Sequence, residues 1–332
     1  MQSGLADTIS FNKTVSFVIP VKNDAKRLQS CLESIIRQNA PGVDKEIIVL
    51  DNGSTDDSIE VAARMGAVVH SAPALSVAQL RNKGALSSKG ELIAFVDADH
   101  VLAENWLMAG LDVMKRQDCG ISGTLCTSPA ATWVQRAYDR FRRRPQVRTE
   151  VEWLGSGNML IRKELFLELN GLDESLETCE DVDFCQRARK NGWRIISDPG
   201  MESIHFGDPA TLKSLFWGEL WRGRNNLRVT MKGPITPRAI LSLVIPALVF
   251  PGIILLLIGF FLQLGGMLLG LPVLLLGIFL IIAPSVLRCI YMSADNMGLL
   301  SVFQNFAVAA TYNFARALAL FVGVSYTTRR AK

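Results

Sequence analysis

The chain has 332 residues, 49% of them hydrophobic and 20% charged, so it is long enough for about two folded domains with ordinary cores. Its formal net charge of +4 is too small to indicate a nucleic-acid partner. The apolar residues are unevenly distributed, because positions 239 to 287 contain no Asp, Glu, Lys or Arg. Such a stretch is longer than a soluble core element needs and can form two apolar helices of about 20 residues each.

The N-terminus and the cysteines both favour a reducing compartment. The first 13 residues, MQSGLADTISFNK, lack the basic start and apolar run of a secretory signal peptide. The six cysteines show no CxxC pair and no spacing typical of a disulfide framework. We therefore expect residues 1–13 to form an N-terminal tail and the part before about residue 235 to stay in the cytosol.

Residues 14 to 100 predict alternating strands and helices. Residues 15 to 21, "EIIVLD", "AVVHS" and "LIAFVDAD" are β-rich or apolar runs typical of buried strands. Between the first two, "DAKRLQSCLESIIRQ" places Leu28, Leu32, Ile35 and Ile36 at helical spacing. Further helices are expected after "DNGST" and over "VAQLRNKGALSSKG". This alternation predicts an α/β fold with a mostly parallel, Rossmann-like sheet covered by helices on both faces.

Polar residues follow three of the expected strands. The segments that contain them begin at Pro20, at Asp51 and at Asp97. A single alanine separates Asp97 from Asp99. In parallel sheets, ligands bind beyond the carboxyl ends of the strands, so these positions are expected to face one cleft. The alternative for the two aspartates is a solvated turn in which one of them caps the following helix.

The motifs "VSFVIPVKN", "EIIVLDNGSTDDS", "LRNKGA" and "LIAFVDADH", in this order, resemble the nucleotide-binding half of family 2 glycosyltransferases, which have a GT-A fold. The resemblance covers roughly residues 14–230. It implies an enzyme that takes a sugar from a nucleotide sugar, most commonly a UDP-sugar, with Mn²⁺ or Mg²⁺ as cofactor. A bare DxD motif is unspecific, but the ordered set is not.

The resemblance also implies roles for the residues at the strand ends. A divalent cation held by carboxylates stabilises the charge of a nucleoside diphosphate leaving group. By resemblance, Asp99 is the metal ligand and Asp97 binds the ribose or a metal-bound water. Asp51 and Arg81 are placed at the nucleotide; the alternatives are an Asx-turn residue and a surface arginine. The loop that contributes mainly backbone groups contains Pro20, Val21 and Asn23.

The acceptor side is expected in "WLGSGNMLIRKELF" and "ETCEDVDFCQRARKNGW". Direct displacement at an anomeric carbon needs a base that takes the proton of the attacking hydroxyl. The "ED" motif of the family matches Glu180 and Asp181, which implies Asp181 as general base and an inverted product. Acidic residues also favour helix N-termini through the dipole, an alternative that suits Asp183 better. The residues expected to bind the acceptor are Gly155, Ser156, Gly157, Glu180, Trp221 and Arg222.

Histidine can complete such a metal site. His205 stands in "SIHFGD", and many members of the family have a histidine at a comparable place. Imidazole is a common metal ligand, so His205 is expected to bind the metal or the diphosphate. The alternative is a histidine that is only packed or hydrogen-bonded. His70 and His100 are expected to be structural.

Two basic segments indicate a further partner. "QRAYDRFRRRPQVR" contains six arginines between positions 136 and 148, which we hypothesise attract an anionic acceptor such as a lipid-linked phosphate. A solvated charged loop is the alternative. "KSLFWGELWRGRNNLR" interleaves Trp217 and Trp221 with arginines, a pattern typical of a helix that lies at lipid headgroups.

Residues 231–332 are expected to form a membrane region. Spans are predicted at about 239–262 and 267–287, and the loop between them has no Lys or Arg. Lys232, Arg238 and Arg288 flank the outer ends, so the positive-inside rule predicts both flanks in the cytoplasm. A third crossing at about 302–324 would export the basic C-terminal residues. We therefore expect an interfacial or re-entrant helix there, with a buried intramembrane Arg316 as the alternative.

These features predict a multi-pass enzyme of the bacterial plasma membrane with its catalytic domain on the cytoplasmic face. The QxxRW motif of processive polysaccharide synthases does not occur, so the expected reaction is a single addition. The expected acceptor is a lipid-linked glycan or an exopolysaccharide precursor, and polysaccharide-assembly proteins are possible partners. One alternative is a polyprenyl-phosphate sugar synthase, although "DADHV" replaces the usual "DADLQ". Another is a non-catalytic nucleotide-binding membrane component, whose expected sign is loss of the acidic residues.

Overall fold

The computed structural model describes residues 13–142, 145–233, 236–293 and 298–321. It divides into two compact units. The first consists of residues 1–127, 144–175 and 180–207, and the second of residues 128–143, 176–179 and 208–332. The expected domain boundary at residue 230 falls inside the second unit. Residues 1–12 of the expected N-terminal tail and the basic residues after position 321 lie outside the described residues.

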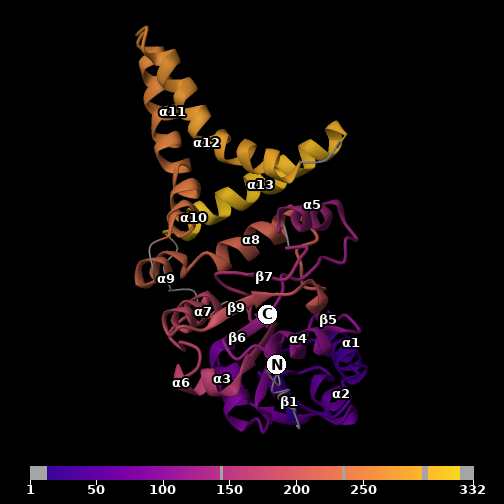
Figure 1. Ribbon diagram of the computed structural model, residues 1–332. Coiled ribbons are helices and arrows are strands. Elements are labelled where there is room, and N and C mark those ends of the chain that lie inside the picture. Colours follow the sequence, from indigo (N-terminus) through magenta and orange to yellow (C-terminus); the bar gives the residue numbers. More distant parts are fainter. Residues whose placement is uncertain (1–12, 143–144, 234–235, 294–297, 322–332) are drawn as a thin grey trace. The chain divides into compact units, whose positions relative to one another are not determined.

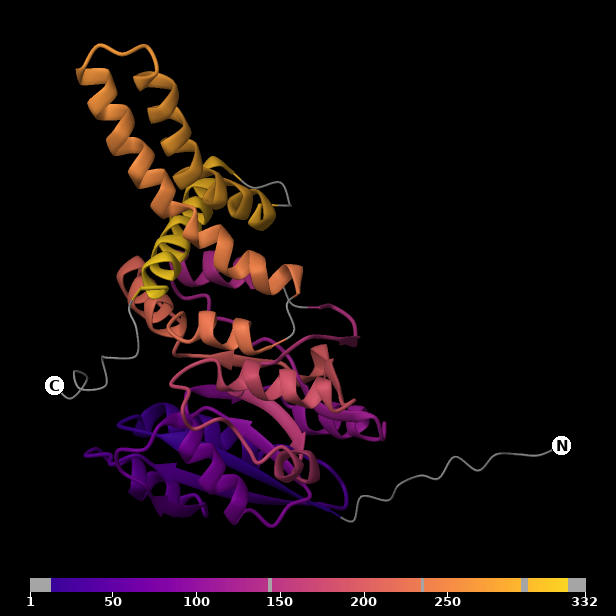
Figure 2. The same ribbon diagram turned by 90° about the vertical axis from the view of Figure 1, so that its left-hand side faces the viewer.

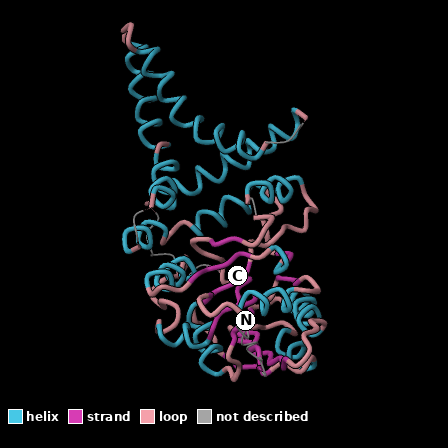
Figure 3. The backbone as a smooth tube through the Cα atoms, in the orientation of Figure 1, coloured by secondary structure: helices cyan, strands magenta, loops and turns pink. Residues whose placement is uncertain are grey.

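The first unit is built on an eight-stranded sheet with the order β3-β2-β1-β4-β8-β6-β9-β7 (Figure 3). Its strands are β1 (Lys13–Val21), β2 (Val43–Asp51), β3 (Val68–Ser71), β4 (Leu92–Val96), β6 (Cys119–Gly123), β7 (Thr149–Glu150), β8 (Asn158–Arg162) and β9 (Arg194–Ser197). The first four strands run parallel to their neighbours, and β9 is parallel to β6. Strand β8 is antiparallel to both β4 and β6, and β7 is antiparallel to β9. The predicted α/β fold with a mostly parallel sheet is confirmed.

Helices cover both faces of this sheet. Successive residues of a strand point to opposite faces, so one strand contributes side chains to two cores. Phe17 and Ile19 of β1 belong to one core cluster, and Val18 between them belongs to the other. The first cluster includes residues of α1 (Ala25–Ile36), α2 (Ser58–Arg64) and α4 (Trp106–Met114). The second includes residues of α3 (Val77–Ser87), α6 (Lys163–Glu168) and α7 (Glu180–Lys190).

Helix α1 buries most, but not all, of the apolar residues that its sequence spacing predicts to be buried. Leu28, Leu32 and Ile35 are fully buried, as their spacing predicts. Ile36, which was expected on the same apolar face, is 46% exposed. It is the last residue of the helix, before the chain continues to β2.

A separate two-stranded sheet joins two distant parts of the first unit. Strand β5 (His100–Leu102) pairs antiparallel with β10 (Ser203–His205), and His205 lies opposite His100. Thr127 is bridged to Ile204 on the other side. This small sheet brings the residues after β4 next to the chain near residue 205.

The elements of the second unit are helices (Figures 1 and 3). They are α5 (Trp133–Phe141), α8 (Leu212–Arg222), α9 (Asn226–Lys232), α10 (Pro237–Ala247), α11 (Val249–Leu264), α12 (Gly270–Met292) and α13 (Leu299–Ala319). Helix α13 packs against α5, α8 and α12. Arg316 of α13 donates to Glu219 of α8 at 2.9 Å, so this arginine has a carboxylate partner within its unit.

Helices α11 and α12 form a long apolar hairpin (Figure 2). The segments Ala239–Leu264 and Gly270–Met292, of 26 and 23 residues, are long and apolar enough to cross a membrane. Their backbones approach closely at glycines: a Cβ added at Gly277 would lie 2.8 Å from the carbonyl oxygen of Gly252. Small residues that permit close packing are typical of helix pairs in lipid.

Candidate active site

The ends of β1 and β2 are tied together by backbone contacts. Val21 pairs with Asp51 in the sheet, and its carbonyl accepts from the N–H of Asn52 at 2.9 Å. Asn23 has a positive φ of 52°, and its side chain accepts from the N–H of Thr55 at 2.7 Å. Pro20 lies in β1, directly before this junction. The predicted loop residues are therefore neighbours in space.

Asp51 is 1% exposed, and its carboxylate is already engaged. It accepts from the backbone N–H groups of Gly53 and Ser54 at 3.0 to 3.2 Å. This is the geometry of an Asx turn, the alternative that the sequence left open. Contact with a nucleotide stays a prediction for this residue.

Arg81 connects two predicted site residues that are distant in sequence. Its guanidinium donates to Asp97 at 2.5 Å and to Glu180 at 2.9 Å. The side chain is 3% exposed, so the interpretation as a surface arginine is wrong. Burial alone lowers the pKa of Arg81, but the two carboxylates reverse this and raise the pKa above its usual value. Arg81 is a fixed positive charge beside the DAD motif.

The segment 155–157 connects the same network to Asp181. Ser156 donates its hydroxyl to Glu180 at 3.2 Å and its backbone N–H to Asp181 at 3.4 Å. Burial and the neighbouring Glu180 carboxylate raise the pKa of Asp181 to about 7. Such a carboxylate can take up a proton near neutral pH. Asp183, in contrast, pairs with Arg187 of its own helix at 2.8 Å.

Gly157 lies against the DAD motif. Its carbonyl accepts from the N–H of Asp97 at 3.2 Å. A Cβ added here would lie 2.5 Å from the Asp97 carboxylate and 3.2 Å from Nε2 of His100. Only a glycine lets the backbone approach both side chains so closely.

Asp99 and His205 form the other side of the site. Their side chains are 3.3 Å apart, and the pairing of β5 with β10 holds them there. Burial raises the pKa of Asp99, but the His205 hydrogen bond and the charges of His205, His100 and Arg27 outweigh it and lower the pKa to about 2. Asp99 therefore stays ionised. Helix α4 begins after Asn105, so the interpretation of the DAD motif as a helix cap is wrong.

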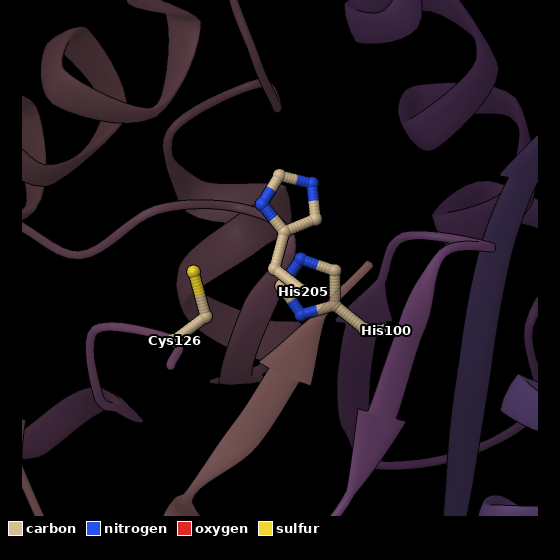
Figure 4. A group of neighbouring side chains, drawn as sticks. All are labelled: His100, Cys126 and His205. Atoms are coloured by element: carbon tan, nitrogen blue, oxygen red, sulfur yellow. The ribbon is translucent and has the colours of Figure 1, made fainter. Parts of the chain in front are cut away.

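His100 and Cys126 join this group, although the sequence analysis assigned them no role at the site. Figure 4 shows Cys126 beside the rings of His100 and His205, whose centroids are 4.6 Å apart. The possible ligand atoms of these three residues lie within 4.8 Å of one another, as do those of Asp97, Asp99 and His100. His100 is 4% exposed, and its Nδ1 lies 3.0 Å from the Ser203 hydroxyl.

The group has the chemistry of a divalent cation site. Carboxylate oxygens suit Mg²⁺ and Mn²⁺, and imidazole nitrogen suits the later divalent metals of the first transition row. Asp99 offers an ionised oxygen, and His205 offers a nitrogen beside it. Because a nitrogen ligand lies beside the oxygen ligand, these residues fit Mn²⁺ better than an ion that prefers oxygen ligands alone, such as Mg²⁺.

Gly207 is a site residue that the sequence did not indicate. A Cβ added there would overlap the Asp99 carboxylate and lie 2.7 Å from Nε2 of His205. We expect Gly207→Ala to push these two side chains apart and weaken Mn²⁺ binding by about tenfold or more, because overpacking costs about 1–3 kcal/mol. Titration with Mn²⁺, followed by electron paramagnetic resonance, measures this. Gly298→Ala, where no atom lies within 4 Å, is the control. Equal Mn²⁺ affinity of Gly207→Ala and wild type would contradict the expectation.

The arginine-rich segment is partly structured rather than a solvated loop. Residues up to Phe141 form α5, and its N-cap Thr132 is part of a capping box. Arg142 pairs with Asp208, and Arg140 donates to the side-chain oxygen of Asn305 at 2.7 and 3.0 Å. Arg148 belongs to the first unit and pairs with Asp112 and Asp198. Arg143 and Arg144 lie outside the described residues.

Trp221 and Arg222 belong to the second unit. Trp221 is 44% exposed, and Arg222 donates to Glu219 at 2.9 Å. Their predicted contact with an acceptor therefore stays a prediction. The residues that the structure does bring together, all in the first unit, are Arg81, Asp97, Asp99, Gly155, Ser156, Gly157, Glu180, Asp181 and His205.

The sequence is similar to known glycosyltransferases. Residues 16–169 match the model of glycosyl transferase family 2. The glycosyltransferase AglE of Haloferax volcanii is 25% identical over 251 residues, which are 71% of this chain and 80% of AglE. The glycosyltransferase GlyG of Streptococcus pneumoniae is 31% identical over 116 residues, which are 33% of this chain and 38% of GlyG.

Two solved structures share the fold. The mannosyltransferase PcManGT from Pyrobaculum calidifontis, in complex with GDP-Man and Mn²⁺, superposes with a TM-score of 0.61 at 14% identity. The alignment covers 93% of this chain and 87% of that one. GalNAc-T7 with UDP, GalNAc and Mn²⁺ has a TM-score of 0.50 at 18% identity, covering 66% of this chain and 48% of that one. At these identities the likeness concerns the fold.

Proposed function

We propose that this chain, whose residues 16–169 match glycosyl transferase family 2, is a membrane-bound inverting enzyme using a nucleotide sugar, with UDP as the nucleotide. The acceptor that we propose is a lipid-linked glycan or a polysaccharide precursor. The observation that carries the proposal is the network in which Arg81 joins Asp97 to Glu180, next to Asp181. The network supports the proposal because it connects the candidate metal-binding motif to the candidate base.

The donor side of the reaction requires stabilisation of a leaving diphosphate. Asp99 and His205 would hold the divalent cation, which when bound neutralises part of the charge on the leaving group. In support, the two solved structures named above both contain Mn²⁺. Asp97 is the proposed partner of the ribose or of a metal-bound water. Arg81 keeps a positive charge in the site and orients the Asp97 carboxylate.

The acceptor side requires a base. Asp181 takes the proton of the attacking hydroxyl, whose oxygen forms a bond to the anomeric carbon. The bond from that carbon to the phosphate oxygen breaks, and its electron pair leaves with the nucleoside diphosphate. Because attack comes from the face opposite the leaving group, the configuration at the anomeric carbon is inverted. The Ser156 N–H, 3.4 Å from Asp181, helps to orient the carboxylate.

The rate should fall on the acid side of neutrality. The pKa of Asp181 is raised to about 7, and a base works only when it is ionised. We therefore expect kcat/KM to decrease about tenfold per pH unit below about pH 7 and to level off above it. Glu180→Gln removes a negative charge that raises this pKa, so its acid limb should move to lower pH. A profile of kcat/KM against pH for both proteins checks this; a flat wild-type profile through neutrality would contradict the base assignment.

The membrane location rests on α11 and α12, whose apolar segments are long enough to span a bilayer. Many of their large side chains are exposed, including Leu257, Phe261 and Leu275. Lys232 and Arg288 lie outside or near the ends of this apolar hairpin, which favours a cytoplasmic location for the catalytic unit. The membrane that we propose is the bacterial plasma membrane. Cysteine accessibility to a membrane-impermeant reagent in intact cells tests the orientation: a residue placed at Gly266, in the turn, should react.

The overall proposal is tested by turnover. The full chain is reconstituted in vesicles and incubated with Mn²⁺ and UDP- or GDP-sugars, and release of nucleoside diphosphate is measured. The product is then examined by NMR for its anomeric configuration. An inverted product is expected, and a retained one would contradict the role of Asp181. Equal, negligible turnover by the wild type and Asp181→Asn with all donors would favour a non-catalytic nucleotide-binding component.

A further inference from the structure

An apolar groove of about 380 Å³ lies in the second unit along helix α12. Its wall contains Phe279, Ala283 and Leu287, which are four residues apart and so share one face of the helix, together with Leu280 next to them. Ile245 of α10 also lines the groove. Nearly all of the lining surface is apolar. Arg288 stands at the C-terminal end of this face.

Arg288 has an unusual environment. Its guanidinium carbon lies 4.5 Å from the ring centroids of both Phe141 and Tyr312. Its Nε is buried without a hydrogen-bond partner, and no carboxylate pairs with its side chain among the described residues. A partly buried cation without an anion is costly, so such residues usually mark a binding site.

The carboxylates of this region are already used by other arginines. Glu219 receives hydrogen bonds from both Arg222 and Arg316 at 2.9 Å, and Asp208 pairs with Arg142. Burial alone raises the pKa of Glu219, but these two arginines outweigh it and lower the pKa to about 2. Glu219 therefore stays ionised, and its charge is balanced by these two arginines. Glu219 acts on Arg288 only through its charge at a distance, so among the described residues Arg288 has no carboxylate in direct contact and can still pair with an anion.

We propose that the groove binds a lipid with a phosphate head, whose hydrocarbon tail lies along α12 and whose phosphate contacts Arg288. The apolar wall suits a hydrocarbon chain, and guanidinium binds phosphate through paired N–H donors. The two aromatic rings hold the guanidinium in place, which lowers the entropy lost on binding. This inference deepens the proposed function, since it rests on α11 and α12 lying in a bilayer and names the chemistry of the acceptor.

Binding of dodecyl phosphate to the full-length protein in neutral detergent micelles tests the proposal without requiring sugar transfer. Dodecanol, dodecanoate and inorganic phosphate are the competing probes. Arg288→Gln should weaken dodecyl phosphate binding at least about tenfold. Ala283→Leu, which fills the groove and keeps the cation, should weaken it as well. Arg64→Gln, at an exposed arginine of α2, carries the same change of charge and should bind like wild type.

Four results would overturn the proposal. Equal affinity of Arg288→Gln and wild type would exclude the arginine, and equal affinity for dodecanol would make the phosphate irrelevant. Equal affinity for inorganic phosphate would indicate a free-ion site, and equal affinity for dodecanoate a carboxylate ligand. If Arg288→Gln fails to fold, Ala283→Leu decides. UDP binding measured on the same samples separates the two proposals: loss of UDP binding with dodecyl phosphate binding intact contradicts only the donor assignment.

Discussion

Replacing Asp99 by Asn is expected to abolish metal-dependent nucleotide binding. Calorimetric titration of UDP into the detergent-purified wild type should show binding that requires Mn²⁺, and Asp99→Asn should show none. The reason is that Asp99 is the ionised carboxylate beside His205, with a pKa lowered to about 2, and an amide offers neither the charge nor the same affinity for a hard cation. The kcat/KM should fall by about 10³-fold or more, since a bound metal supplies several kcal/mol of charge stabilisation.

The matched control for this experiment is Asp57→Asn. Asp57 is exposed, precedes α2 and makes no side-chain capping bond, so its replacement should leave UDP affinity unchanged. Wild-type binding that is equally tight without Mn²⁺ would mean that Asp99 and His205 do not hold a cation for the nucleotide. Loss of UDP binding in both variants would instead point to a general effect of charge.

The fold was predictable because its first half follows local rules. Phe17, Val18 and Ile19 alternate between two cores, and each strand there is parallel to a neighbour reached through a helix. The insertion of β8 between β4 and β6 was not predictable. "NMLIR" has the composition of a buried strand, but no local pattern states which strands it pairs with or in which direction. Its pairing with β4 joins residues more than sixty positions apart in sequence.

The site residues that could be predicted are those whose side chains carry the chemistry. Those that matter because the backbone passes close to another side chain could not be predicted. Asp97, Asp99 and Glu180 stand in recognisable motifs, and the structure joins the first and last of them through Arg81. Gly207 gave no signal, because its importance is the missing Cβ beside Asp99 and His205. Cys126 also gave none, since it is the bridge between Thr127 and Ile204 that brings it near His205. A histidine directly after the DAD motif was the one available hint.

Asp181→Asn is expected to separate catalysis from donor binding. The variant should bind UDP and Mn²⁺ like the wild type, because no hydrogen bond joins Asp181 directly to Asp97, Asp99 or Arg81 among the described residues; the hydrogen-bonded link runs through Ser156 and Glu180. Its kcat should fall by about 10²- to 10⁴-fold, the usual contribution of a general base. The asparagine oxygen can still accept the Val182 N–H that now lies 2.8 Å from Asp181, so the start of α7 should persist. Both substitutions should stop turnover, but only Asp181→Asn should leave the affinity for the nucleotide intact.

Asp183→Asn distinguishes a base from an acidic residue that merely favours a helix N-terminus. Both aspartates lie in the first turn of α7 and interact with its dipole, but Asp183 pairs with Arg187 instead of facing Ser156. If the dipole were the reason for both, the two substitutions would lower stability alike and spare kcat per folded molecule. If Asp181 is the base, only its replacement stops turnover. A kcat for Asp183→Asn as low as that of Asp181→Asn would therefore remove the assignment and, with it, the expectation of an inverted product.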